Sequence, residues 1–305
     1  MAAIEIGASG VIDNNAVRLS LATALERDLL MRIATQRALV TTVDGAAALS
    51  VPEVPFVAAA LEAVRTTSTD QDCAALVIPA WWSARARDGV VALLGESDPC
   101  IAVFDDAQAA IAEWAADGGA VPDTLAVVSL RAAHSSVVIV ENCQTNPVTL
   151  PSPALVHDEG GDDLDAAVLR HVLMSLESVG ITDVGADARA MQSALRQCRM
   201  VRESLSGAAT ESVRLELPGV DTAVRLVRGE IEDISLPWVD AVVHLVMSAL
   251  DLYGAPVDAV LLTGGVATMP LVSQRLSADL GIDVLLPAES ALISVRGAER
   301  LRSRN

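Results

Sequence analysis

The segment from Val257 to Leu276 most constrains what this chain can fold into. An apolar run of strand length ends in Gly264-Gly265, and an amphipathic pattern follows, with Pro270 where a first helical turn tolerates proline. A strand, a glycine turn and a helix in this order let a ligand approach the backbone closely, because glycine has no Cβ. A tight strand-to-helix corner in an α/β domain explains the same pattern, so the rest of the chain must decide between these interpretations.

Charge and composition exclude several classes of partner. The 305-residue chain carries a formal net charge of −19 and contains only four Trp, one Tyr and two Phe. A nucleic-acid backbone would be repelled and would find no stacking platform. No apolar run reaches the ~18 residues of a membrane span, and the N-terminus lacks the basic start of a signal peptide. We therefore expect a cytoplasmic protein with no nucleic-acid partner and no membrane insertion.

Lysine is absent, and every basic residue other than histidine is arginine. This excludes a Walker A loop, a kinase-type phosphate-pairing lysine and Schiff-base chemistry. The four cysteines and four histidines lie far apart, without the spacing of a zinc site or a redox dithiol. We therefore expect buried reduced thiols and no metal site built from these residues. Arginine in place of lysine, with abundant Ala and Val, indicates a GC-rich source genome.

Hydrophobic patterning predicts a mixed α/β chain in two similar halves. We expect lobe I over residues 1–119 and lobe II over 120–287, joined near the Gly118-Gly119 segment. Lobe II includes a helical and β insertion at about 180–255, and a C-terminal helix over 288–302 packs back on lobe I. The expected elements are a hairpin turning at Asp44-Gly45, strands over 73–79, 100–104, 124–130 and 136–141, and helices over 107–116, 162–179, 186–205 and 236–253.

Four segments, in this order, resemble the nucleotide-binding domain of the 70-kDa heat-shock (DnaK-type) chaperones, members of the actin-like ATPase superfamily. They are the strand end Val77-Ile78-Pro79-Ala80-Trp81-Trp82, the turn Glu159-Gly160-Gly161-Asp162-Asp163-Leu164-Asp165, the helix Cys198 to Ser206, and the loop Leu261-Leu262-Thr263-Gly264-Gly265 with Met269-Pro270. The resemblance covers about 73 to 300. It implies a two-lobed, duplicated ribonuclease-H-like fold, with an outer first-lobe subdomain reduced because residues 8 to 72 are shorter than the family's equivalent.

The same resemblance implies where nucleotide and metal would lie. Catalytic carboxylates would fall on Glu5, Asp105 and Asp106. Nucleotide contacts would come from Gly7, Ser9, Gly160, Gly161, Arg202, Ser206, Gly264 and Gly265. The implied cofactor is ATP or ADP, with Mg²⁺ if the nucleotide is bound.

The implied phosphate chemistry is altered in this sequence. The family's second phosphate loop falls on Ser129-Leu130-Arg131-Ala132-Ala133-His134, so a carboxylate has become Ser129 and three glycines have become Arg131, Ala132 and Ala133. These side chains would fill the space through which backbone N–H groups reach phosphate oxygens. The family's catalytic lysine has no counterpart, and losing it would cost several kcal/mol of barrier stabilisation.

Three sequence features can be explained either by a ligand site or by the packing of the fold alone. Gly160-Gly161 is either a phosphate-side turn or a plain helix N-terminus, where Asp162 and Asp163 favour the helix dipole. The acidic run around this turn lacks the ligand order of a calcium loop, which favours a solvated loop. Trp81-Trp82 closes a core more readily than it forms a ligand platform.

Three functions remain open on the sequence. The leading hypothesis is a chaperone-like pseudo-ATPase, or weak adenine-nucleotide binder, that acts through a protein partner. The second is a working ATPase with substituted chemistry, using Glu5 and Asp105 or Asp106 at the metal and Arg131 for charge. The third is an accessory protein of a secretion or envelope system, because the N-terminus and the Trp81-Trp82 segment are slightly similar to actinobacterial type VII secretion-associated proteins. We expect no peptide-binding domain in this chain.

Overall fold

A computed structural model describes residues 3–7, 10–13, 18–19, 40–43, 46–49, 74–82, 84, 87–88, 91, 101–178, 188–217 and 219–304. Side chains are described only from Ala75 onward. The predicted site residue Ser9, the side chain of Glu5 and most of the segment predicted to be a reduced subdomain therefore lie outside the described residues.

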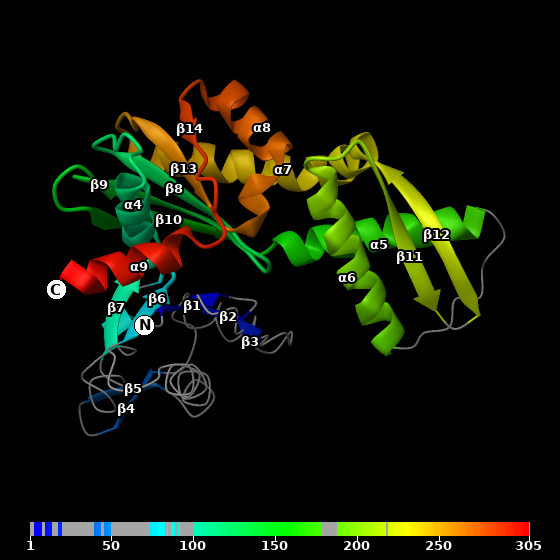
Figure 1. The fold of residues 1–305 in the computed structure, drawn as a ribbon. Helices are drawn as coiled ribbons and strands as arrows, with labels where there is room; N and C mark the ends of the chain where they lie inside the picture. The colour runs from blue at the N-terminus through cyan, green and yellow to red at the C-terminus, as the bar shows by residue number, and fades with distance from the viewer. Residues whose placement is uncertain are drawn as a thin grey trace.

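Two five-stranded sheets have the same strand order and the same pattern of directions (Figure 1). The first has the order β3-β2-β1-β6-β7, and the second has the order β10-β9-β8-β13-β14. In each sheet the first three strands in the chain pair antiparallel, and the next two join parallel to the first strand. The strands are β1 (Ala3–Gly7), β2 (Gly10–Asp13), β3 (Arg18–Leu19), β6 (Ala74–Ile78), β7 (Ile101–Asp105), β8 (Leu125–Leu130), β9 (Ser135–Glu141), β10 (Val148–His157), β13 (Ala259–Thr263) and β14 (Asp283–Leu285).

This repetition is the duplicated ribonuclease-H-like arrangement expected of an actin-like ATPase, so the predicted fold class is confirmed. Both halves also insert extra structure at the same point, between their third and fourth strands. In the first half the described part of the insertion is the hairpin of β4 (Val40–Val43) and β5 (Ala46–Leu49). In the second half it consists of α5 (Gly161–Ser178), α6 (Ala188–Leu205), β11 (Thr210–Leu217), β12 (Val220–Val227) and α7 (Arg228–Tyr253).

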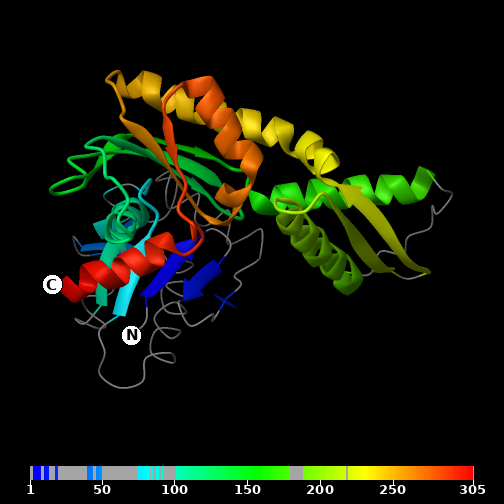
Figure 2. The same cartoon turned by 45° about the horizontal axis from the view of Figure 1, so that its top comes forward.

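Two helices, α4 (Asp106–Ala116) and α9 (Ile293–Arg304), lie together between the sheets (Figures 1 and 2). The two helices pack on each other, and α9 also contacts β1 and β6. Their crossing is so close that a Cβ at Gly297 would overlap the carbonyl oxygen of Ala109. Arg300 of α9 pairs with the buried carboxylate of Glu113 on α4. We call the first sheet with α4 and α9 the first half, and the second sheet with its insertion and α8 the second half.

The second sheet is the better buried of the two described sheets. Every residue of β8 and β13 is buried, as expected for central strands covered on both faces. One face packs on α7 and on α8 (Pro270–Leu280), through a cluster that includes Trp238, Val242 and Val246. Of the described helices, α7 alone is long and apolar enough to resemble a membrane span. Its apolar face contacts this sheet, so it is a core helix.

The α7 helix differs from its prediction at one end. The sequence predicts a start near Leu236, because a proline next to it favours a first turn. The structure begins the helix at Arg228 and continues it through Pro237. Pro237 is on the exposed side of the helix, so water can reach the carbonyl that its missing N–H leaves unbonded.

The helices α5 and α6 with the hairpin β11–β12 form an arm that extends away from both sheets (Figures 1 and 2). The arm has its own apolar core, which includes Val172, Cys198 and Leu215. The β11–β12 hairpin turns around Gly219, which has φ 81°. An independent core of this kind lets the arm keep its shape with few contacts to the sheets.

Candidate functional site

The candidate site lies where the carboxyl ends of the central strands of both sheets meet. Parallel strands end at the same edge of a sheet, and ligands of open α/β folds bind outside that edge. Here β7 ends at Asp105, β8 runs to Leu130 and β13 ends at Thr263. The β6 strand runs into the turn of residues 79–82. Residues from both halves are brought together at this edge.

Asp106 is at the centre of the polar network at this edge. One carboxylate oxygen accepts a hydrogen bond from the Ala80 amide at 2.7 Å. The other accepts a hydrogen bond from the Ser129 hydroxyl at 3.2 Å and forms an ion pair with the Arg131 guanidinium at 2.8 Å. Ser129 also hydrogen-bonds to the Thr263 hydroxyl at 2.8 Å. Asp106, from the first half, is thus bound by the Ala80 amide of its own half and by two side chains of the second half, and it is 3% exposed.

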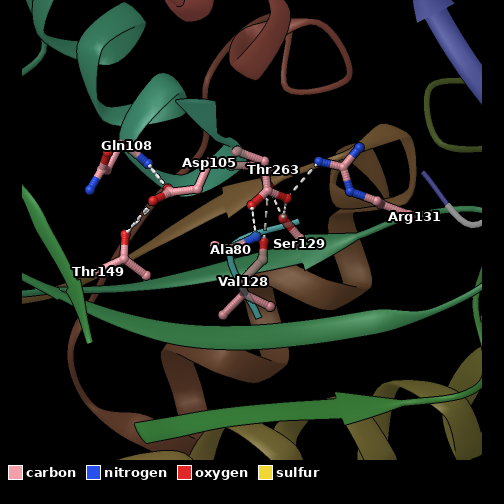
Figure 3. Close-up of polar contacts among 9 residues, drawn as sticks. Ala80, Asp105, Gln108, Val128, Ser129, Arg131, Thr149 and Thr263 are labelled. Carbon is pink, nitrogen blue, oxygen red and sulfur yellow. Dashed lines mark hydrogen bonds and ion pairs between the residues drawn. The ribbon is translucent and has the colours of Figure 1, made fainter. Parts of the chain in front are cut away.

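Asp105 points in a different direction. It caps α4, accepting a hydrogen bond from the Gln108 amide at 2.8 Å, and the Thr149 hydroxyl of β10 donates to it at 3.1 Å (Figure 3). Burial raises the pKa of its carboxyl from 3.8 to about 6, opposed by the Gln108 amide and by Arg87. The neighbouring charge of Asp106 adds to the rise. The two adjacent aspartates therefore have separate roles in the structure, although the resemblance could not separate them.

An aromatic contact lies beside the network. The indole of Trp81, in the turn after β6, meets the His134 ring edge-on, with 5.3 Å between ring centroids. Both residues are buried, and so is Trp82. Trp81 and Trp82 thus close a core between the halves, which agrees with the structural alternative for this pair.

The turn at Gly160-Gly161 packs on the loop that replaces the second phosphate loop. The Gly161 amide donates to the Arg131 carbonyl at 2.9 Å, and the Asp162 amide donates to the Ala132 carbonyl at 2.7 Å. The Gly160 amide donates to the Asp163 carboxylate at 2.9 Å. These first amides of α5 would be the groups that bind a phosphate, but they are bonded within the protein. A Cβ at Gly160 would collide with the Arg131 and Ala132 backbone, so packing alone requires this glycine.

The residues predicted at the adenosine end also come together. Arg202 is buried and donates to the Asp165 carboxylate at 2.7 Å. Burial raises the pKa of Asp165, although Arg202 acts in the opposite direction. Ser206 lies at the end of the same helix. A small pocket, partly open to solvent, lies between the ends of α6, α7 and α8, and is lined by Arg202, Leu205, Ser206, Arg228, Ile231, Glu232, Met269, Pro270 and Leu271.

The Gly264 turn connects this pocket to the polar network. Gly264 has φ 92°, and a Cβ there would overlap the Leu130 carbonyl oxygen. Ser290 holds the turn twice, because its carbonyl accepts from the Gly264 amide at 2.8 Å and its hydroxyl donates to the Gly264 carbonyl at 3.1 Å. Gly265 begins a short 3₁₀ helix, Gly265–Thr268, and has open space around it.

Most predicted site residues therefore lie along one continuous region. Those it includes are Asp105, Asp106, Gly160, Gly161, Arg202, Ser206, Gly264 and Gly265. Glu5 and Gly7 lie on β1, which pairs with β6 through Glu5 and Val77. Sequence reasoning missed Thr149, Asp165 and Ser290 as parts of the site. A buried arginine on a helix calls for a carboxylate, and this signal could have led from Arg202 to Asp165.

The Mg²⁺ ion and phosphates implied by the resemblance do not fit the described side chains. Asp106, the carboxylate facing the network, is bound to Arg131, and the amides at the start of α5 are bonded to the neighbouring loop. Among the described residues, no group of three or more His, Cys, Asp or Glu side chains is arranged to hold a metal ion. The arrangement can bridge the two halves of the molecule, but its described residues present no phosphate cradle.

Comparison with known proteins places the similarity in the second half. Residues 147–285 match the family model described as Hsp70 protein. A segment of 124 residues is 30% identical to the heat shock 70 kDa protein BIP3 of Oryza sativa subsp. japonica, covering 38% of this chain and 18% of that relative. The matched range contains Gly160, Gly161, Arg202, Ser206 and Gly264. It begins after the Asp106–Arg131 network. The match shows an Hsp70-like segment over residues 147–285, and the duplicated sheets agree with the actin-like ATPase fold of an Hsp70-like nucleotide-binding domain.

Proposed function

We propose that this protein is an Hsp70-like pseudo-ATPase, which keeps the scaffold of a nucleotide-binding domain and acts through a protein partner without hydrolysing ATP. The observation that carries the proposal is the ion pair of Arg131 with Asp106 at 2.8 Å, at the place where the resemblance locates phosphate and metal. Phosphoryl transfer depends on positioned cations and on donors directed at the phosphate. Here the cation and carboxylate neutralise each other.

The adenosine end supports weak binding of an adenine nucleotide. Its residues lie within the range that matches the Hsp70 model, and two of them, Arg202 and Ser206, line the pocket between α6, α7 and α8. A nucleoside there would be held without the phosphate contacts that supply much of the affinity of ordinary nucleotide sites. We therefore expect ADP and ATP to bind with similar, low affinity, and Mg²⁺ to change that affinity little.

The deciding experiment is calorimetry of the full chain with Mg-ATP and Mg-ADP, combined with a phosphate-release assay. The proposal expects weak or absent binding and no turnover above the background of a heat-denatured sample. Robust turnover would overturn it. Binding of Mg-ATP without turnover would identify a nucleotide-gated switch. This is a form of the same proposal, in which the partner distinguishes the nucleotide-bound protein from the free protein.

One observation favours a second candidate, an ATPase with substituted residues. Asp105 is a buried carboxylate whose pKa is raised to about 6, which is near the value a general base needs at neutral pH. If turnover is found, Asp105→Asn should abolish it while leaving the cap of α4 intact, since asparagine is an equally good N-cap. Activity that survives Asp105→Asn but disappears in Arg131→Ala would assign the chemistry to the arginine instead.

A further inference from the structure

Contacts join the two halves at three neighbouring points, of which the first two are buried and the third is half-buried. Asp106 of the first half pairs with Arg131 of the second. Trp81 of the first half meets His134 of the second. The third point is the Thr149 hydroxyl, which donates to Asp105, with the Gln108 side chain donating to the Pro147 carbonyl at 3.1 Å close by. The strongest electrostatic contact of this set is the first one.

The Asp106–Arg131 pair is placed to act as a bridge. Both side chains are below 10% exposed, so solvent screens their attraction little. The same carboxylate also accepts from the Ala80 amide and from the Ser129 hydroxyl, so each of its oxygens has a donor. A guanidinium stays protonated at every physiological pH. The cation of this bridge is therefore part of the chain and keeps its charge at every physiological pH.

We infer that Arg131 is a tethered cation, fixed to the chain itself, that holds the two halves closed in place of a bound ligand. The Arg131 guanidinium contacts the Asp106 carboxylate of the first half, and the same carboxylate accepts from the Ser129 hydroxyl near the end of β8. Arg131 supplies this charge from within the chain, since its backbone continues directly from β8. The halves are then closed without nucleotide, and a partner meets a single, constant conformation. This inference concerns how the halves are held, and it goes beyond whether ATP binds.

Removing the guanidinium should open the contact between the halves. Asp106 would be left as a buried charge without its cation, and such groups draw in water or separate from their surroundings. The Trp81–His134 contact lies next to it, because Trp81 directly follows Ala80, whose amide donates to Asp106. We therefore expect the turn of residues 79–82 and the loop of residues 131–136 to loosen together.

The test is amide hydrogen exchange, read by mass spectrometry on the full chain, for the wild type and Arg131→Met. Methionine keeps the apolar stem and removes the charge. Exchange in peptides covering 79–82 and 131–136 should become faster on the order of tenfold or more, while peptides of the arm stay unchanged. Arg202→Met is the matched control, because Arg202–Asp165 is an equally buried pair at 2.7 Å that lies wholly within the second half. This control should loosen α5 and α6 and leave 79–82 unchanged.

Two outcomes would overturn the inference. One is unchanged exchange at 79–82 and 131–136 in Arg131→Met. The other is an equal rise throughout the chain, since the pair would then act on global stability and not on the contact between the halves. If Arg131→Met does not fold, Arg131→Lys retains the charge without the planar fork, and a partial loosening confined to the same two segments supports the tether. ATP turnover by the wild type would overturn the proposed function but leave the tether standing if these segments still loosen.

Discussion

Replacing Asp105 with asparagine should make the protein more stable at neutral pH. Asp105 is 3% exposed, and burial raises the pKa of its carboxyl from 3.8 to about 6. The folded state therefore binds this proton more tightly than the unfolded state does, so stability from this group is full below pH ~4 and declines as the pH rises to ~6. Each pKa unit corresponds to ~1.4 kcal/mol, so the charged carboxylate costs up to about 3 kcal/mol of unfolding free energy above pH 6.

The neutral amide avoids this cost and keeps the local contacts. An asparagine oxygen can still accept from the Gln108 amide and the Thr149 hydroxyl, and asparagine caps helices as well as aspartate does. We expect Asp105→Asn to gain about 1–3 kcal/mol over the wild type at pH 7.5, with the difference shrinking toward zero near pH 4. Unfolding in urea at several pH values, followed by two probes whose transitions must coincide, measures this difference.

The control is Asp233→Asn, an exposed position on α7 that should change stability by less than ~0.5 kcal/mol at any of these pH values. A loss of stability in Asp105→Asn at pH 7.5 would refute the reasoning. Such a loss would mean that the charged form of Asp105 is favoured in the folded state, and that a nearby cation outweighs the burial.

Two further predictions each compare a glycine that close packing requires with a glycine that has open space around it. Gly297→Ala should destabilise the protein by about 3 kcal/mol or more, because the new Cβ overlaps the backbone of α4, whereas Gly229→Ala, with open space around it, should be neutral or slightly stabilising in thermal unfolding. Gly264→Ala should cost about 2 kcal/mol or more because of its positive φ and the carbonyl facing it, whereas Gly265→Ala should cost less than ~1 kcal/mol. Equal losses within either pair would contradict the close approaches described for Gly297 and Gly264.

The segment from Val257 to Leu276 shows which parts of the fold were predictable. Its apolar run forms β13, and α8 begins at Pro270, as the proline and the amphipathic pattern predict. The 3₁₀ turn between them was not predicted, because four residues are too few to show a periodicity. The strand order of the sheets also depends on pairings between distant segments, such as β8 with β13, which local patterns do not encode.

Most residues of the candidate site could be predicted from the sequence, but the contacts between them could not. The resemblance locates Asp105 and Asp106 together, yet only the helix geometry decides that one caps α4 and the other faces Arg131. The resemblance identified Arg131 as a change from a family glycine. Its ion-pair partner, Asp106, could not be predicted, because that contact depends on how the two halves pack. The compartment, the protein partner, the lobe boundaries and the accessory role in a secretion system stay predictions, because no contact among the described residues bears on them.

The glycines that first indicated a ligand site are required by the fold itself. A side chain at Gly264 would overlap the Leu130 carbonyl, and one at Gly160 would collide with the Arg131 and Ala132 backbone. Both turns therefore need glycine to pack on the loop after β8, whether or not any phosphate is bound. The presence of glycine thus preserves the geometry of the ancestral cleft and says little about its use. Phosphate binding depends instead on the loop they pack on, because phosphate oxygens require accessible backbone N–H groups, and in this loop the Arg131 guanidinium is bonded to Asp106.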